Sequence, residues 1–523
     1  MIIYYYLFKL LFFVATRTMF SLSEDKSLAL GISLDLSKWK YQALRVFLNE
    51  ENCTQLPSYQ KLLCAKKRCY PIDMEYSERG ACIRLQALLD HTMQRILMDL
   101  EPITSSSNQG LKMTWKWGID GSSSQSNYKQ RSLDPEFDDS SVVMISVVPL
   151  RMVDGTDLIV WENPTPSSTQ YCRPVKFTFT SETSDFVKNE TSQMDKEIEE
   201  LVPSRFGDIS ISHELHMTMI DGKVVNIVAE VPSSASCPIC LAKPSEMNNL
   251  DLVATKPIRE DIFKYGISSL HMRIRCMECL LHISYNMDFE RWSARGDHKV
   301  LKQTKKVTTQ REFREQMGLL IDIVKQGFGT TNDGNTARRF FSNYKMSSKI
   351  TGIDEKLIFR FAVILQALCS GLRVNTERFA IYSRETAEMY VALYPWYHMP
   401  TSVHKLLMHG ADICKHFSVL PIGILSEEAS EARNKDFRNV RERHTRKTGR
   451  AENNADILHS LLISSDPHIS RTRLKFSKST HKELLPEAVE LLLNDSMGHD
   501  IEEEELLIPH NDSIIDPKYN LGL

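Results

Sequence analysis

The sequence predicts a mixed α/β protein with a strand-rich central part between two helical parts. Three observations lead to this prediction. The chain has 523 residues, 42% of them hydrophobic and 25% charged, so it is globular and long enough for roughly three domains. Between residues 111 and 231, several runs alternate apolar with other residues, as strands do. Before and after this part, apolar residues recur every three or four positions, as on helices.

Charge and cysteine content narrow the class of protein. The net charge of −3 is the sum of acidic and basic blocks that cancel, so the local distribution of charge is more informative than the total. The eleven cysteines are an odd number scattered over a long chain, with two CxxC pairs among them. This usage favours reduced thiols and a metal site over a disulfide framework.

The first 20 residues are excluded from the predicted fold. Their apolar run is interrupted by Lys9 and is too short to span a bilayer. It also lacks a positive segment before it and a small-x-small cleavage site after it. Two interpretations stay open: an apolar leader, or a mis-assigned start whose true first residue is Met19. We expect no membrane partner.

The elements then follow in chain order. Residues 21–110 are predicted to be helical, with one apolar stripe between Leu85 and Leu100 and a polar linker at 104–110. The elements predicted next are a strand ending at Asp120, strands at Val142–Val148, Leu158–Trp161 and Val175–Thr180, a charged helix at Asp185–Leu201, and a hairpin that joins a strand ending at Asp221 to its partner Val224–Val231.

Helices predominate again from Cys237 to about Leu420, with a long apolar helix at Ile353–Leu372. The Ala- and Glu-rich segment around Glu431 predicts another helix. The tail after Lys475 contains the acidic run Glu502–Glu505 and is expected to be mobile.

Three acidic residues are candidates for a metal site. Asp120 lies where a half-buried strand meets a Gly/Ser turn, Asp221 ends a later strand, and Glu431 lies on the predicted helix. Taken singly, each has an ordinary explanation, because an Asp beside Gly commonly forms a turn and Glu431 has other glutamates near it. Brought together by folding, the three carboxylates would bind a hard divalent cation, which prefers oxygen ligands.

A second candidate metal site begins at Cys237 and Cys240, in a tight turn that follows a strand, where two thiolates can bind one zinc ion. A second pair of ligands is needed. Residues 276 and 279 provide another CxxC pair, but it lies in an apolar helical stretch that is typical of buried core cysteines. The other candidates are two histidines, His404 and His409.

The spacing of the two histidines sets a condition. Residues five apart on a regular helix point about 140° away from each other. His404 and His409 are therefore expected to share an ion only if the helix ends or distorts near His409, and Gly410 is suited to end it. From the residues alone, the choice between the second cysteine pair and the histidines stays open.

A dense basic run follows Glu431. It is typical either of a solvated charged helix or of phosphate binding, and its position directly after the third acid favours phosphate binding. The candidate DNA-binding residues are Arg438, Arg441, Arg443, Arg446 and Lys447.

Several motifs spread over the chain carry a resemblance to a known family. The sequence closely resembles the Transib DNA transposases, relatives of the catalytic core of the V(D)J recombinase, and the similarity runs with gaps from about Leu36 to Arg471. The motifs that carry it are Trp117–Ser123, Tyr394–Pro400 with Val403–Lys405, Leu420–Gly423, Ser426–Lys435, Pro57–Tyr59, Cys172–Pro174, Gly334–Arg339 and Ser464–Pro467.

The resemblance implies a fold and a set of parts. The fold would be an RNase H-like mixed sheet with a large, mostly helical zinc-binding insertion and a helical N-terminal region. The implied parts are 1–20, an apolar leader or mis-assigned start; 21–110, a helical DNA-binding or dimerisation region; 111–232, the first part of the RNase H-like domain; 233–420, the zinc-binding insertion; 421–475, the closing helix and basic C-terminal helices; and 476–523, an acidic flexible tail.

The resemblance also implies site residues and cofactors. Asp120, Asp221 and Glu431 would form a DDE triad that binds Mg²⁺ or Mn²⁺, with Glu428 as the alternative to Glu431. The family pairs its CxxC with HxxxxH, and this favours Cys237, Cys240, His404 and His409 as ligands of a structural Zn²⁺.

The implied function is cut-and-paste transposition. Such an enzyme binds the terminal inverted repeats of double-stranded DNA, nicks them, forms hairpins on the flanking DNA, and transfers 3′-hydroxyl ends to target DNA. A homodimer in the nucleus is expected. The alternative is a domesticated DNA-binding protein of the same fold without cleavage activity.

Overall fold

The computed structural model describes residues 20–51, 54–100, 110–123, 125, 132, 134, 137–325, 329–474 and 484–493. The leader at 1–20, the linker at 104–110 and the acidic run Glu502–Glu505 lie outside the described residues, apart from Phe20 and Gly110. Within the described chain, no helix is both long and apolar enough to cross a membrane.

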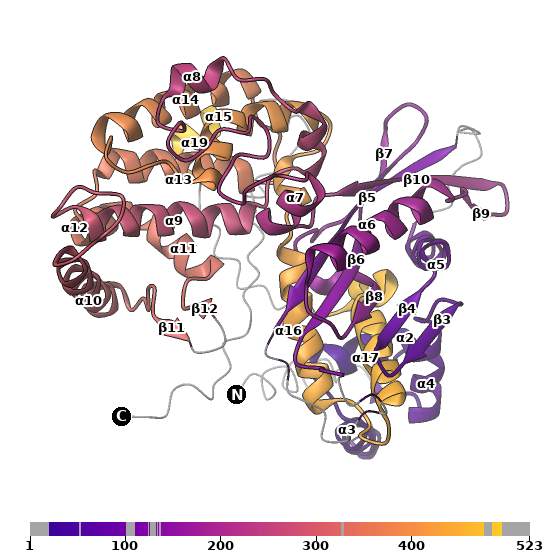
Figure 1. Ribbon diagram of the computed structural model, residues 1–523. Coiled ribbons are helices and arrows are strands. Elements are labelled where there is room, and N and C mark those ends of the chain that lie inside the picture. The colour runs from indigo at the N-terminus through magenta and orange to yellow at the C-terminus, as the bar shows by residue number, and fades with distance from the viewer. Residues whose placement is uncertain are drawn as a thin grey trace.

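A mixed sheet of eight strands forms the centre of one lobe (Figure 1). Its order is β3-β4-β8-β6-β5-β10-β9, and β7 pairs with β6 off this path. All neighbours are antiparallel except β5 and β10, which run parallel. The strands are β3 (Met74–Ser77), β4 (Gly80–Ile83), β5 (Leu111–Ser122), β6 (Val142–Val153), β7 (Ile159–Glu162), β8 (Arg173–Thr178), β9 (Ser204–Phe206) and β10 (Ile209–Met217).

Strand β5 is buried on both faces, whereas its alternating pattern predicted a half-buried strand. Trp115 and Trp117 are buried, as expected for the apolar face. Lys116, which points to the opposite face, is also completely buried. That face is covered by helix α16 (Glu428–Arg443) from the C-terminal part of the chain, which the sequence pattern of β5 could not indicate.

The predicted hairpin at Asp221 is wrong. Residues 222–228 form helix α7 (Gly222–Val228), and β10 pairs instead with β5 and β9. The side chain of Asp221 accepts a hydrogen bond from the backbone N–H of Val224 at 2.8 Å, which caps the first turn of this helix. Asp-Gly therefore starts a helix here, because both edges of β10 already have partner strands.

The N-terminal region is only partly helical. Helices α2 (Glu24–Ser33), α3 (Lys38–Glu50) and α4 (Tyr59–Lys67) pack around a small separate core to which Ile463 and Ile469 also contribute. The next residues form β3 and β4, which join the main sheet, so the predicted boundary at residue 110 falls within the sheet lobe. Helix α5 (Leu85–Leu97) carries the predicted apolar stripe and packs against β8 and β9.

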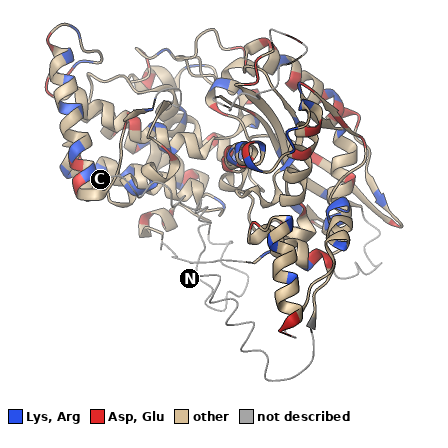
Figure 2. Ribbon diagram, turned by 90° about the horizontal axis from the view of Figure 1, so that it is seen from below, with Lys and Arg blue, Asp and Glu red and all other residues tan. Residues whose placement is uncertain are grey.

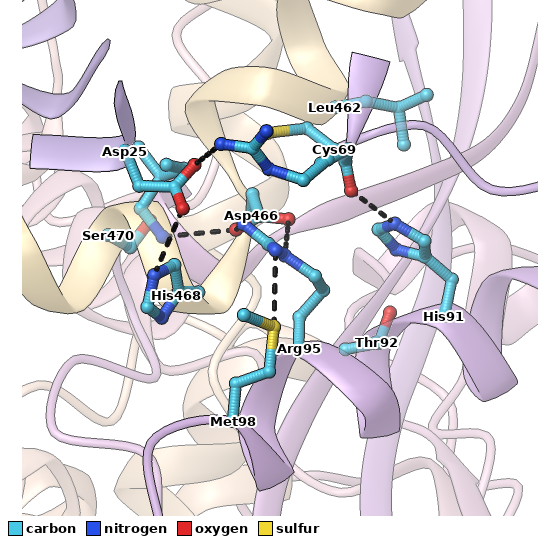
Figure 3. Close-up of polar contacts among 12 residues, drawn as sticks. Asp25, Cys69, His91, Thr92, Arg95, Met98, Leu462, Asp466, His468 and Ser470 are labelled. Carbon is cyan, nitrogen blue, oxygen red and sulfur yellow. Dashed lines mark hydrogen bonds and ion pairs between the residues drawn. The ribbon is translucent and has the colours of Figure 1, made fainter. Parts of the chain in front are cut away.

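A buried ion pair connects this region to the start of helix α18 (Pro467–Thr472), which follows α17 (Arg450–Ser464) (Figure 3). Both carboxylate oxygens of Asp466 accept from the guanidinium of Arg95 on α5, at 2.8 and 3.0 Å. The two side chains are 0% and 3% exposed. Asp466 also caps α18, because its Oδ1 accepts from the N–H of Ile469.

The chain from Cys237 to Leu420 forms a second, mostly helical lobe, as predicted (Figure 1). The expected charged helix at 185–201 and the long apolar helix at 353–372 are confirmed as α6 (Ser184–Glu199) and α13 (Glu355–Cys369). Besides α13, the helical lobe contains α8 (Leu250–Ala254), α9 (Ser269–Asn286), α10 (His298–Met317), α11 (Gly334–Ser342), α12 (Tyr344–Thr351), α14 (Thr376–Leu393) and α15 (Thr401–His416), whereas α6 lies against the sheet lobe.

Part of the predicted flexible tail belongs to this lobe. Residues 484–493 contain helix α19 (Pro486–Glu490), which packs against α13. Leu493 donates its backbone N–H to the carbonyl of Arg373, and Leu491 accepts from the N–H of Asn375. Burial of Leu491 and Leu492 explains why this segment is held.

Candidate active site and metal centre

The fold brings the three candidate acids together. Asp120 lies near the end of β5, Asp221 follows the parallel neighbour β10, and Glu431 lies in the first turn of α16. Burial raises the pKa of Asp120 well above its usual value, and the nearby charges of Glu431 and Asp221 raise it further. The three carboxylates, separated by up to 311 positions in the chain, are therefore close enough for the charges of Glu431 and Asp221 to act on Asp120.

A glycine allows the segment before Asp221 to approach β5. A Cβ atom at Gly118 would lie 1.9 Å from the carbonyl oxygen of Met219. The backbone N–H groups of Thr218 and Met219 both donate to the carbonyl of Trp117 at 3.1 Å. Any side chain at position 118 would displace this segment, and Asp221 with it.

A buried lysine attaches the start of α16 to the sheet. The ammonium of Lys116 donates to the carbonyls of Ile424 and Ser426, at 2.8 and 2.6 Å. Burial lowers the pKa of Lys116 to about 8. Lys116 and Asp120 lie on the same face of β5. By fixing the residues just before α16, Lys116 helps to hold Glu431 over that face.

Two oxygen-bearing side chains complete the surroundings of Asp120, and sequence reasoning missed both. Asn434 donates its amide to Asp120 Oδ2 at 2.6 Å, and its own Oδ1 is buried with no hydrogen-bond partner within the described chain. Glu182 likewise has a buried Oε1 without such a partner, while its Oε2 lies 3.3 Å from Lys223. Asn434 could have been found from its position, because it lies three residues after Glu431 on the same helix face.

The neighbouring glutamates at the start of α16 point to different partners. Glu428 forms an ion pair with Arg338 at 3.1 Å. Glu427 is buried and accepts from the ring nitrogen Nδ1 of His271 at 3.0 Å. Glu431 faces the other ring nitrogen of His271 at 3.4 Å and is the glutamate of this group whose charge acts on Asp120.

His271 connects this helix to α9. Burial alone would lower its pKa, but the hydrogen bond and charge of Glu427, with the charges of Glu431 and Asp221, raise it to about 9. The imidazolium is therefore a positive charge beside the acidic cluster. The sequence offered no signal for it, because it lies 160 positions before Glu431.

A second cluster joins the start of the helical lobe to α15. Its four side chains are buried, and their candidate ligand atoms lie within 4.8 Å of one another. Hydrogen bonds from within the cluster, first of all from Cys237, lower the pKa of the Cys240 thiol. Two thiols and two imidazoles are the donor set that zinc prefers, so this cluster could hold a structural zinc ion. The residues are Cys237, Cys240, His404 and His409.

Both histidines lie on a continuous helix, contrary to the expected break. Helix α15 runs through to His416, and the rings of His404 and His409 are 5.2 Å apart between centroids. The two rings therefore lie close together although the helix is continuous. Gly410 does not end the helix; a Cβ there would lie 3.1 Å from the ring of Phe379, so the glycine allows α14 to cross closely.

The alternative cysteine pair lies inside the helical core, as its apolar context predicted. Cys276 and Cys279 are buried on α9, and the thiol of Cys279 lies 3.4 Å from the hydroxyl of Tyr390. Among the described residues, the cluster of Cys237 with the two histidines is the group of potential ligands gathered closely enough to hold an ion.

The basic run does not form one exposed helix. Helix α16 ends at Arg443, and a loop leads to α17. Arg441 is 4% exposed and pairs with Asp139 at 2.7 Å, so it lies inside the fold rather than on the exposed basic surface that the sequence suggested. Its guanidinium also lies 4.4 Å from the ring centre of Phe179, which explains its burial.

The other basic residues remain closer to the surface. Arg438 donates to the carbonyl of Ser123, just past the end of β5, and Arg446 pairs with Asp456 at 2.9 Å. Arg443 and Lys447 are exposed. In the view from below, basic and acidic residues are interspersed over both lobes (Figure 2).

Comparison with known proteins adds little to this geometry. The sequence matches no protein-family model and no curated protein. Among solved structures, a chain of the Drosophila P element transposase strand transfer complex matches with a TM-score of 0.32 and 10% sequence identity. The match covers 85% of this chain and 92% of that chain. A TM-score of this size does not establish a common fold, so the function proposed below rests on residues of this chain.

Proposed function

We propose that the protein is a DNA transposase that cuts and transfers DNA strands by metal-dependent chemistry at Asp120, Asp221 and Glu431. The observation that carries this proposal is that these three carboxylates, from β5, from the start of α7 and from α16, lie close enough for Asp221 and Glu431 to raise the pKa of Asp120. A cation would relieve the repulsion between these charges. The proposal includes double-stranded DNA as substrate, a homodimer, and a nuclear location.

The residues around the acids fit a hard divalent ion, Mg²⁺ or Mn²⁺. All the side chains that could bind it are oxygen donors, and the buried Oδ1 of Asn434 and Oε1 of Glu182 lack hydrogen-bond partners among the described residues. Two such ions, when bound, activate an attacking oxygen and stabilise a leaving oxygen on phosphorus. The amide of Asn434 would orient Asp120, since it donates to Oδ2 of that carboxylate.

The topology supports an RNase H-like assignment. Strands β5, β6 and β8, which follow one another along the chain, pair antiparallel, with β6 in the middle. Strand β10 comes later in the chain and pairs parallel with β5 on the other side. Asp120 lies on β5, and Asp221 lies four residues after the end of the adjacent parallel strand β10, at the start of α7. We propose that the helical lobe with its zinc-binding cluster is the insertion between Asp221 and Glu431.

DNA would reach this site along the start of the basic run. Arg438 lies beside Ser123, three residues after Asp120, and Arg443 is exposed at the end of the same helix. Their positive charge would attract the phosphate backbone without reading sequence. Arg446 and Lys447 extend this surface in the loop that follows α16.

The test is nicking of the DNA that flanks the gene, including any terminal inverted repeats, by the wild-type protein and the Asp120→Asn variant with Mg²⁺ or Mn²⁺. We expect the variant to lose about 1,000-fold or more in nicking rate, because loss of one metal ligand removes several kcal/mol of transition-state stabilisation. DNA binding measured in the same buffer should be unchanged. The matched control is Asp208→Asn, in the exposed turn between β9 and β10.

Two outcomes would contradict the proposal. Nicking that survives in Asp120→Asn would remove Asp120 from the chemistry. A wild-type protein that binds this DNA but never nicks it, with either metal, would instead favour the non-cutting DNA-binding protein.

A further inference from the structure

Helix α10, at the outer edge of the helical lobe, concentrates positive charge (Figure 1). It carries six Lys and Arg residues against two Glu residues, although the whole chain has a net charge of −3. Within the described chain, Lys306 is the one cation of the six that forms an ion pair, with Asp322 at 2.6 Å. Burial and the nearby charge of Lys306 lower the pKa of Lys302. The described residues therefore leave most of this charge without a carboxylate beside it.

The solvent-facing side of α10 combines cations with apolar side chains. Val300 is 69% and Val307 52% exposed, and the exposed Arg314 lies seven residues further along. These three residues project within about 40° of one another on a regular helix. Thr309 and Phe313, on the other side of the helix, are buried.

The segment after α10 extends the apolar part of this side. The amide of Gln310 donates to the carbonyls of Ile321 and Asp322, at 3.1 and 2.9 Å, and holds the segment against the helix. Within it, Leu320 is 47% and Val324 75% exposed. A cationic–apolar surface is thus formed by Val300, Val307, Arg311, Arg314, Leu320 and Val324.

This surface indicates the chemistry of its partner. The phosphate backbone of a nucleic acid would pair with the cations but would leave the apolar side chains without apolar contacts. An exposed apolar patch marks a surface that another apolar group covers. The surface therefore fits an acidic segment of polypeptide that also carries apolar residues.

The C-terminal tail of this chain has that composition. Residues 494–523, which lie outside the described residues, contain eight Asp and Glu residues and one Lys. The acidic run Glu502–Glu505 is followed directly by the apolar run Leu506–Ile508. Acidic and apolar side chains are therefore adjacent in the tail, as cationic and apolar side chains are on α10.

The tail is long enough to reach α10. Leu493, just before it, is held in the helical lobe, because its backbone N–H donates to the carbonyl of Arg373 at 2.9 Å. The roughly 15 residues from Leu493 to Ile508 span up to about 50 Å when extended. A lobe of roughly 190 residues is about 40 Å across.

We infer that the acidic tail binds the cationic–apolar surface of α10 in the same chain. Glu502–Glu505 pair with the cations, and Leu506–Ile508 cover the apolar side chains beside them. Because the tail is tethered, its effective concentration at this surface is on the order of 1 mM, so even a weak contact is occupied. The bound tail shields α10 from other polyanions. This inference does not depend on the proposed chemistry.

Binding of a fluorescent peptide of residues 494–523 tests the inference. A chain that ends at Leu493 should bind the peptide with a Kd on the order of 10 to 100 μM at low salt, and more weakly as salt screens the charges. The full chain should bind the peptide at least about tenfold more weakly, because its own tail occupies the surface.

Variants of the shortened chain locate the contact. Arg311→Glu with Arg314→Glu should weaken peptide binding at least about tenfold, because two attractions become repulsions. Val307→Ser should weaken it about threefold without a change of charge. Lys61→Glu with Lys67→Glu, two exposed positions on α4, is the matched control for the change of net charge and should bind like the unmodified shortened chain. Circular dichroism checks that each variant is folded.

Carbodiimide cross-linking of the full chain identifies which copy supplies the tail. In an equimolar mixture of ¹⁵N-labelled and unlabelled chains, amide bonds between Glu502–Glu505 and the lysines of α10 should join peptides of the same isotope. Mass spectrometry of the digested mixture distinguishes these from bonds between two copies.

The inference fails on any of three results. They are a shortened chain whose Kd for the peptide lies above about 1 mM, a full chain that binds the peptide as tightly as the shortened one, and cross-links that join different isotopes as often as equal ones. A fourth result would replace the tail by another partner. If double-stranded DNA binds the shortened chain, the Arg311 and Arg314 variant loses that binding, and the peptide does not compete, α10 contacts nucleic acid instead.

Discussion

At the scale of single residues, the three glutamates at the start of α16 show how side-chain direction assigns roles that spacing cannot. Glu427 and Glu428 are engaged with His271 and Arg338, while Glu431 acts on the charge of Asp120. Residues three or four apart share a helix face, but the composition of this segment gave no reason to prefer one of them. The preference comes from what each carboxylate meets in the folded chain.

This arrangement makes a prediction about the third acid. Glu431→Gln should reduce metal-dependent nicking by about 100-fold or more, because it removes a charged metal ligand. Glu428→Gln should retain nicking but lower the thermal midpoint, because it breaks the ion pair with Arg338. Parallel nicking assays and melting curves compare the two variants. Loss of nicking only in Glu428→Gln would move the third ligand to that position.

At the scale of elements, α15 is joined to the turn at residues 237–240 by the Cys and His cluster. Neither element makes this connection through regular secondary structure, so a zinc ion would hold them together. Burial of the cluster leaves no open position for substrate, which fits a structural rather than a catalytic ion.

Cys237→Ser should therefore lower the zinc content from about one ion per chain to near zero and lower the thermal midpoint. Cys276→Ser is the matched control, because Cys276 is equally buried but lies in the core of α9, and its zinc content should be unchanged. Inductively coupled plasma mass spectrometry measures both. Zinc loss in the control with retention in Cys237→Ser would show that the ligand set is wrong.

At the scale of the whole molecule, α18 joins the N-terminal helices to the sheet lobe through charged groups (Figure 3). His468 lies 2.8 Å from Asp99 after α5 and 3.6 Å from Asp25 on α2. Hydrogen bonds to Asp25 and Asp99 raise the pKa of His468 to about 9. The same contact, together with Arg68, lowers the pKa of Asp25 to about 2.

These shifts predict how stability depends on pH. The contribution of His468 is fully present below its unfolded pKa of about 6.5 and is lost as pH rises through about 9. At pH 7, His468→Gln should lower the free energy of unfolding by about 1 to 2 kcal/mol, allowing for partial solvent screening. Urea midpoints of variant and wild type should differ at pH 7 and converge at pH 10. A difference that persists at pH 10 would contradict the assigned role of the imidazolium.

Much of the secondary structure followed from the sequence. The apolar stripe of α5, the charged helix α6 and the long helix α13 have periodicities that arise from neighbouring residues, and these were predicted close to their observed bounds. The hairpin at Asp221 and the fully helical region before residue 110 were predicted wrongly. In both places the contacts with other strands of the sheet decide whether the chain forms a strand, and these contacts come from distant parts of the sequence.

The sequence by itself determined most of the elements, the candidate acids and the CxxC pair, since periodicity and local motifs depend on residues close along the chain. Only the tertiary structure decided which groups meet: Glu431 with Asp120, the Cys237 turn with α15, and Arg441 with Asp139 inside the fold. The physical reason is that burial, charge and pKa depend on contacts between segments that are hundreds of residues apart.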